Sequence, residues 1–312
     1  MFNDFSQYDG RGAGGYDELF QQEEIRHVLV RHEQGAGHAA EGYARSTGKT
    51  GVMLVTSGPG ATNASIGVHT AMQDSAPMLL FVGQVGTDMK GREAFQEVDY
   101  RQMFGGLAKW VAEVDDTARL PEYISRAFHV AMSGRPGPVV LALPEDMLSA
   151  EADVPDLPAR ATGVTHVAPE AADAVLEALA TAEQPLVVAG GPLWTDDAAR
   201  NLTRFAQAHG LPVAVAFRRQ DYMDNHHPNY VGDLSVGMRP GLKAALEAAD
   251  ALLILGSRFG DIASGGYAID PASPGKTVIH VHPDPDEMGR VYRPDVAVCA
   301  GAPAMLEALA AR

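Results

Sequence analysis

The chain has 312 residues, of which 46% are hydrophobic and 21% are charged, and its formal net charge is −16 at pH 7. At about 150 residues per domain, this length predicts two domains, and the ordinary composition excludes intrinsic disorder, collagen and coiled-coil architectures. The acidic balance argues against nucleic acid as the main partner, because binding of phosphates requires a surplus of clustered Lys and Arg.

The single cysteine limits the redox chemistry of the chain. Cys299 cannot form an intrachain disulfide or a cysteine-based zinc cluster, and its neighbours Val298 and Ala300 favour a place for it in the core. No stretch reaches the ~20 consecutive apolar residues of a membrane span, and residues 1–15 lack the hydrophobic core of a signal peptide. We therefore expect a cytoplasmic protein that does not enter the membrane.

Short apolar runs alternate along the chain with segments of helical periodicity. Continuous apolar runs are typical of strands buried on both faces, and their alternation with helices indicates a parallel sheet. The expected strands are 28–30, 52–55, 78–82, 139–142, 186–189, 213–216, 251–255 and 278–279. The expected helices outside the motifs below are 120–132, 171–182, 196–208 and 241–249. The pattern predicts an α/β fold with two doubly wound parallel-sheet domains and flanking helices.

The domain division follows from a loss of periodicity between residues 143 and 169, where four prolines interrupt a polar stretch. Such a stretch is typical of an interdomain linker. We expect an unassigned tail over 1–16, a first domain over 17–148, a linker over 149–168 and a second domain over 169–312.

Several common catalytic signatures are absent from the sequence. A P-loop needs a glycine five residues before its Gly-Lys-Thr, but Tyr43 precedes 48–50 and Asp270 precedes 275–277 at that spacing. No serine lies in a G-x-S-x-G motif, and no H-E-x-x-H occurs. The adjacent pair 226–227 cannot present two histidines on one helical face, so we expect a surface loop there.

Glu33 follows the apolar run 28–30 and precedes a segment rich in alanine and glycine. A carboxylate at the carboxyl end of a parallel strand lies where α/β proteins bind ligands. An acidic residue in the first turn of a helix is also favoured by the helix dipole alone. Both interpretations stay open on these residues alone.

Two further loops follow neighbouring strands. The run 52–55 leads into 56–63, a Gly-Pro-Gly loop whose missing side chains let a flat ligand approach the backbone at a helix start. The polar loop after 78–82 contains 95–97, where a phenylalanine beside an amide is suited to lining a small-substrate pocket.

A family resemblance is carried by segments in both expected domains. In the first domain these are 31–45, 56–63, 71–77, 94–97 and 134–139, and in the second 189–192, 249–261 and 279–285. In this order they resemble the pyrimidine-binding and middle domains of thiamine-diphosphate enzymes of the acetolactate synthase group. The resemblance extends from about residue 17 to the end of the chain.

The resemblance implies roles for individual residues. Glu33 would hydrogen-bond N1′ of the aminopyrimidine and favour the 4′-imino tautomer, which removes the thiazolium C2 proton and gives the carbanion that attacks a 2-keto acid. Glu33 and Gln96 would be catalytic, and Phe95 and Gln96 would lie at the edge of the substrate channel. The cofactor contacts implied are Glu33, Gly58, Pro59, Gly60 and Asn63.

The family's Gly-Asp-Gly motif, which together with a downstream asparagine holds the divalent metal, does not occur; 232–234 and 260–262 are the nearest matches. We therefore expect no metal site in this chain and a separate diphosphate-binding domain that supplies Mg²⁺. The implied function is part of a carboligase or decarboxylase of 2-keto acids such as pyruvate, in a homo-oligomer and inactive as this chain alone. The alternative is a catalytically incompetent fragment or an interaction module of the same fold.

The resemblance also raises the question of FAD, which acetolactate synthases hold in the middle domain. Residues of the second domain that match the flavin-binding motifs are Gly190, Gly191, Gly256, Arg258 and Asp261. Against a flavin, His282 stands where flavin-binding members usually carry Asp, and a neutral imidazole accepts through one nitrogen only. We expect no stoichiometric FAD.

Overall fold

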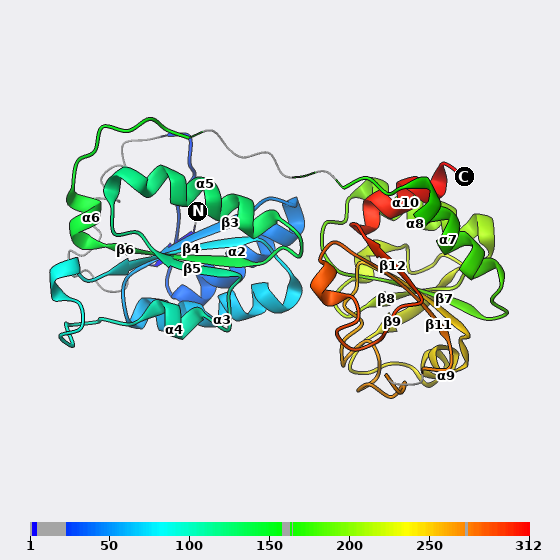
Figure 1. The fold of residues 1–312 in the computed structure, drawn as a ribbon. Coiled ribbons are helices and arrows are strands. Elements are labelled where there is room, and N and C mark those ends of the chain that lie inside the picture. Colours follow the sequence, from blue (N-terminus) through cyan, green and yellow to red (C-terminus); the bar gives the residue numbers. More distant parts are fainter. Residues whose placement is uncertain (1, 5–22, 158–162, 164, 272–273) are drawn as a thin grey trace. The chain divides into compact units, whose positions relative to one another are not determined.

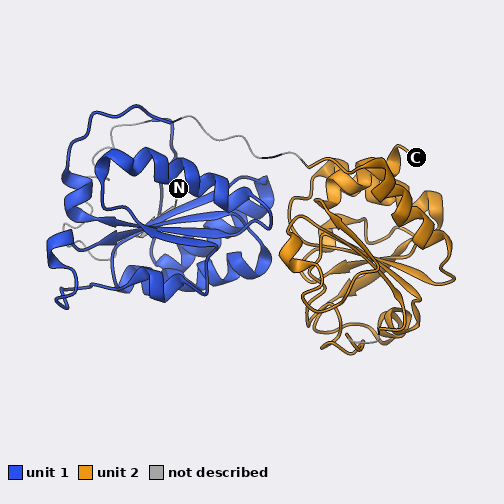
Figure 2. Cartoon of the chain, viewed as in Figure 1, with its two compact units in different colours: residues 1–163 blue, residues 164–312 orange. Residues whose placement is uncertain are grey.

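The computed structural model describes residues 2–4, 23–157, 163, 165–271 and 274–312. It divides into two compact units, residues 1–163 and 164–312 (Figure 2). Each unit contains a six-stranded sheet in which every pair is parallel, with helices on both faces (Figure 1). The α/β class with two doubly wound sheets is thereby confirmed.

The sheet of unit 1 has the order β2-β1-β3-β4-β6-β5. Its strands are β1 (Phe2–Asp4), β2 (Val28–Val30), β3 (Gly51–Val55), β4 (Met78–Gln84), β5 (Trp110–Glu113) and β6 (Pro138–Pro144). Its α-helices are α2 (Glu33–Thr47), α3 (Pro59–Asp74), α4 (Tyr100–Phe104), α5 (Leu120–Met132) and α6 (Glu145–Ser149). Short 3₁₀ helices cover Thr87–Met89 and Thr117–Arg119. Helices α2, α3 and α4 pack on one face of the sheet and α5 on the other.

Helices α2 and α3 meet backbone to backbone. A Cβ added at Gly67 would lie 2.5 Å from Cα of Gly37, and one added at Gly37 would lie 2.8 Å from Cα of Gly67. Side chains cannot be accommodated at that distance, so the small residues of both helices are what allows them to pack this closely.

The sheet of unit 2 has the order β12-β11-β10-β7-β8-β9. Its strands are β7 (Pro185–Ala189), β8 (Val213–Ala216), β9 (Tyr230–Leu234), β10 (Ala251–Leu255), β11 (Thr277–His282) and β12 (Val296–Cys299). Its α-helices are α7 (Pro169–Ala180), α8 (Asp196–His209), α9 (Pro240–Ala248) and α10 (Ala302–Ala310), with 3₁₀ helices over Gln220–Tyr222 and Pro285–Glu287. Helices α7, α8 and α10 cover one face of this sheet, and α9 lies on the other. In the part of the chain that is described, no helix has the length and hydropathy needed to cross a membrane.

Two expectations about the ends of the chain are wrong. Residues 2–4, assigned to a tail, form β1 between β2 and β3; the rest of that tail lies outside the described residues. Cys299, assigned to the core, is exposed. It lies on the edge strand β12, where alternate side chains face opposite ways, and its neighbour Val298 is the one that is buried.

Besides β1, three further strands, β5, β9 and β12, are missing from the expected strands. Strand β5 is an edge strand of the sheet in unit 1, and its one buried residue is Ala112. Strand β12 is an edge strand of the sheet in unit 2 and also has one buried residue, Val298. Strand β9 contains Gly232 and Asp233, which strands usually avoid. Edge strands need no continuous apolar run, because one side of each is open to solvent.

The close contact of α2 and α3 predicts the effect of an added methyl group. We expect Gly67→Ala to lower the free energy of unfolding of unit 1 by about 1–3 kcal/mol, because the methyl group overpacks the contact. The matched control is Gly42→Ala, in α2 but with no atom within 4 Å of the added Cβ. It should stabilise by about 0.5–1 kcal/mol through helix propensity. The free energy of unfolding of unit 1 is measured for both variants by urea unfolding, with amide exchange of peptides from unit 1 as the readout. Equal stability of the two variants would contradict a close contact between α2 and α3 at Gly67.

Candidate active site

The candidate site lies at the carboxyl ends of β2, β3 and β4 in unit 1. Glu33 is the first residue of α2, directly after β2, and its side chain is buried at 3% exposure. His32 caps this helix, because its Nδ1 accepts a hydrogen bond of 3.1 Å from the backbone N–H of Gln34. Helix start and strand end thus place the carboxylate at the edge of the sheet where parallel α/β proteins bind ligands.

Asn63 holds the carboxylate from the neighbouring helix. Its Nδ2 donates to Oε2 of Glu33 at 3.0 Å. A Cβ added at Gly60 would lie 3.6 Å from Oε1 of Glu33 and 2.8 Å from Cγ2 of Thr56, so the missing side chain lets this turn pack close to the carboxylate. A carboxylate offers about four acceptor positions. With one hydrogen bond from Asn63, the carboxylate keeps capacity to accept from a further donor.

The Gly-Pro-Gly turn packs against the loop that carries Gln96. Gly58 has φ 35° and ψ −95°, and a Cβ there would lie 3.0 Å from both Cβ and the carbonyl oxygen of Gln96. Pro59 is the first residue of α3, where its missing N–H costs no helical hydrogen bond. Only glycine fits at position 58, because both its backbone angles and its contact with Gln96 exclude a side chain.

Side chains also fix the loop around Gln96. Ser57, which is buried, donates from Oγ to Oε1 of Gln96 at 2.9 Å, and Gln96 itself has φ 68°. The Glu97 carboxylate accepts from the backbone N–H groups of Gly91 at 2.6 Å and Ala94 at 3.1 Å. These two bonds hold the pKa of Glu97 below its usual value. The loop is therefore shaped by its own hydrogen bonds, while Phe95 is 66% exposed.

Tyr100 is a further site residue that the sequence did not reveal. It is 2% exposed, and its hydroxyl accepts from the N–H of Gly58 at 2.9 Å and donates to the carbonyl of Gly83 at 3.3 Å. Burial raises the pKa of Tyr100 to about 12, so the hydroxyl keeps the proton that it donates. In the sequence this residue has the appearance of core filling, and its ring does lie 6.3 Å from that of Phe104.

The structure brings the expected residues together in two groups. Glu33, Gly60 and Asn63 form one group, and Gly58 and Gln96 form the other, joined through the turn between them. At this turn Oγ1 of Thr56 is buried without a hydrogen-bond partner among the described residues. A buried carboxylate with spare acceptor capacity and an unsatisfied hydroxyl at the same turn fit a flat heteroaromatic ring with nitrogen donors and acceptors, such as an aminopyrimidine.

The described residues also bear on the question of a metal centre. Within the residues that the structure describes, no group of three or more His, Cys, Asp or Glu side chains is placed to hold a metal ion. A Mg²⁺ ion that anchors a diphosphate requires oxygen ligands, such as the carboxylates of Asp and Glu.

The glycine-rich turns of unit 2 pack on one another. A Cβ at Gly191 would lie 1.7 Å from the carbonyl oxygen of Gly256. The N–H of Gly190 donates to the carbonyl of Leu255 at 2.9 Å, and the N–H of Gly256 donates to that of Val281 at 2.8 Å. These two N–H groups are therefore already bonded within the sheet rather than directed toward a diphosphate.

Side chains fill the space at the first of these turns. Trp194 donates from Nε1 to the carbonyl of Gly190 at 2.8 Å, and the Tyr222 hydroxyl donates to the carbonyl of Gly191 at 2.7 Å. The two rings stack with centroids 4.4 Å apart, and Nε of Arg219 also donates to Gly191, at 3.1 Å. The close packing of the turns explains the glycines without a ligand.

His282 is fully buried at the end of β11, next to these turns. Its Nδ1 accepts from the backbone N–H of Asp284 at 3.1 Å, and its Nε2 has no partner among the described residues. Burial lowers the pKa of His282 to about 4, so the ring is neutral near pH 7. Of the other expected flavin contacts, Asp261 is exposed and Arg258 is half-buried.

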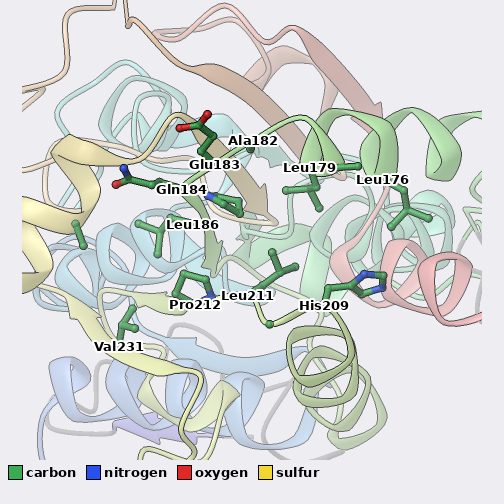
Figure 3. A pocket seen from close by; sticks show the side chains of 14 residues that line it. Leu176, Leu179, Ala182, Glu183, Gln184, Leu186, His209, Leu211, Pro212 and Val231 are labelled. Carbon is green, nitrogen blue, oxygen red and sulfur yellow. The ribbon is translucent and has the colours of Figure 1, made fainter.

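A cavity of about 720 Å³ lies elsewhere in unit 2 (Figure 3). Apolar side chains form most of its labelled wall, among them Leu179, Leu186, Leu211 and Val231. It lies at the amino ends of β7 and β8, opposite to the end where parallel sheets bind ligands. We therefore place the candidate chemistry in unit 1.

Comparison with known proteins gives two family matches. Residues 5–103 match the model described as "Thiamine pyrophosphate enzyme, N-terminal TPP binding domain", and residues 172–309 match "Thiamine pyrophosphate enzyme, central domain". The chain is 37% identical over 299 residues to the acetolactate synthase large subunit of Corynebacterium glutamicum, covering 94% of this chain and 47% of that protein. It is 35% identical over 300 residues to the acetolactate synthase large subunit of Lactococcus lactis, covering 94% and 52%. The chain thus spans about half the length of these curated relatives.

Proposed function

Because the chain belongs to the thiamine pyrophosphate enzyme family, we propose that unit 1 binds the aminopyrimidine ring of thiamine diphosphate in an acetolactate synthase-like carboligase or decarboxylase of 2-keto acids such as pyruvate. The observation that carries this proposal is the buried Glu33 carboxylate, bonded to Asn63 and packed beside the Gly60 backbone. In this proposal residues 17–148 form the pyrimidine-binding domain and residues 169–312 the central domain, with 149–168 linking them.

In this proposal each site residue of unit 1 would make a separate contact with the cofactor or the substrate. Glu33 holds a proton at N1′ of the pyrimidine ring, and Asn63 fixes the carboxylate for that contact. The backbone of Gly58, Pro59 and Gly60 lies against the ring. When bound, thiamine diphosphate supplies the nucleophilic carbon that attacks the keto group. Phe95 and Gln96 line the path of the 2-keto acid, with the Gln96 amide oriented by Ser57.

The first test replaces the carboxylate of Glu33. We expect Glu33→Gln to leave the fold nearly intact but to lower C2 proton exchange of thiamine diphosphate by about 100-fold or more, the scale of lost general acid–base catalysis. Exchange is measured by NMR in a complex completed by a diphosphate-binding domain. The matched control is Glu41→Gln, a second buried glutamate on α2, paired with Arg45. Wild-type exchange in the Glu33 variant would remove Glu33 from the mechanism.

We further propose that a separate diphosphate-binding domain completes the site and supplies the Mg²⁺ ligands. The described residues offer no cluster of metal ligands, and a catalytic carboxylate without an anchored cofactor has nothing to act on. On this proposal the chain alone is inactive.

Titration calorimetry tests that dependence. We expect this chain, titrated with thiamine diphosphate and Mg²⁺, to bind weakly or not at all, because the described residues offer no ligand cluster for a Mg²⁺ ion that would anchor the diphosphate. Addition of a family member's diphosphate-binding domain should restore binding. Tight Mg²⁺-dependent binding by the chain alone would show that it contains an anchor of its own.

We also propose that unit 2 holds no FAD. The bonded N–H groups of Gly190 and Gly256 and the buried, neutral His282 do not fit a dinucleotide diphosphate at these turns. Unit 2 would then serve as a scaffold.

The absorption spectrum of the purified chain decides between scaffold and flavin domain. We expect no flavin absorption band, because the unit offers no free N–H groups at Gly190 and Gly256 to hold the diphosphate. Reconstitution with excess FAD followed by gel filtration is the control. A yellow protein with about one flavin per chain would overturn the proposal.

Two broader features of the protein stay proposals. We propose a homo-oligomer, because Tyr43 on α2 and Ile66 on α3 expose large apolar side chains on the helices that form the site. We propose the cytoplasm as its location, because a chain with one cysteine has no intrachain disulfide that an oxidising compartment would stabilise.

A further inference from the structure

The hydroxyl of Tyr100 bridges two backbone segments that come from different strands. It accepts from the N–H of Gly58, in the turn after β3, and donates to the carbonyl of Gly83, within β4. The two segments lie side by side, since a Cβ at Gly83 would be 3.5 Å from the backbone nitrogen of Ser57. One phenolic oxygen thus links the turn that follows β3 to the carboxyl end of the adjacent parallel strand β4.

The turn that receives this bond is the one that shapes the site. Gly58 has a backbone conformation that L side chains rarely adopt, and its N–H is buried, so it needs an acceptor within the protein. On one side the turn continues into Gly60, which faces Glu33. On its other side it contacts Gln96, whose amide is held by Ser57. Both halves of the candidate site therefore depend on the position of Gly58.

We propose that Tyr100 is a positioning residue, whose hydroxyl fixes the Gly58 turn and thereby sets both the pyrimidine surface at Gly60 and the Gln96 loop. This inference rests on the proposed function of unit 1. Tyr100 acts through Gly58 and does not itself touch Glu33 in any contact that the structure records. Its ring packs in the core beside Phe104, so the ring and the hydroxyl have separable roles.

The variant Tyr100→Phe removes the hydroxyl and keeps the ring. Its matched control is Tyr123→Phe, a half-buried tyrosine of the same unit whose ring stacks on Trp110 with centroids 5.9 Å apart. The full chain contains three Ser-Gly steps, at 57–58, 133–134 and 264–265. Labelling with carbonyl-¹³C serine and ¹⁵N glycine therefore isolates the amide of Gly58 and provides one reference amide in each unit.

In wild type we expect the Gly58 amide to be protected from hydrogen exchange. In Tyr100→Phe its exchange should be faster by about tenfold or more, because a buried N–H that has lost its acceptor opens more readily. Gly134 and Gly265 should be unchanged, as should all three amides in Tyr123→Phe. In a complex completed by a diphosphate-binding domain, titration with thiamine diphosphate and Mg²⁺ should shift the Gly58 signal, with affinity reduced about fivefold in Tyr100→Phe only, on the scale of one lost hydrogen bond.

The outcomes separate the inference from the proposed function. Exchange of Gly58 at the unprotected rate in wild type overturns the inference without any variant. Unchanged Gly58 exchange in Tyr100→Phe overturns it, as does equal acceleration of Gly58 and Gly134, which indicates a general loosening of unit 1. If wild type in that complex does not respond to thiamine diphosphate while the Gly58 difference persists, the positioning by Tyr100 is supported and the proposed function is contradicted.

Discussion

The approach of α2 and α3 at Gly37 and Gly67 is the constraint on which the site of unit 1 depends. Glu33 begins one of these helices and Asn63 lies in the first half of the other, so the 3.0 Å bond between their side chains requires the helices to be this close. Any side chain at the contact would move the two helices apart. The chemistry of the carboxylate is thus determined by packing about one helical turn away from it.

Glycines after parallel strands allow close packing in both units. In unit 1, Gly60 packs against Thr56 and beside the Glu33 carboxylate, and Gly58 packs against Gln96. In unit 2, Gly191 packs against the backbone of Gly256, and the N–H groups of Gly190 and Gly256 are bonded within the sheet. The turn of unit 1 differs because it lies beside a buried carboxylate.

Much of the fold was predictable from the sequence because buried strands and amphipathic helices have distinct periods. Helix 120–132 was predicted with the bounds of α5, and strand 251–255 with those of β10. Strands β5 and β12 were not, since edge strands need only one apolar face. Of the candidate site, the order of motifs pointed to Glu33, Asn63 and the glycine turn. Tyr100 could not be found this way, because its function depends on which backbone groups its hydroxyl meets in three dimensions.

The exposed position of Cys299 on the edge strand β12 affects how the protein must be handled. An accessible thiol with no intrachain partner forms disulfides between molecules when a solution is exposed to air. Such a covalent pair has twice the mass of the chain and would be mistaken for a native dimer in sizing experiments. Measurements of assembly therefore require a reducing agent or replacement of this single sulfur atom by oxygen, as in Cys299→Ser.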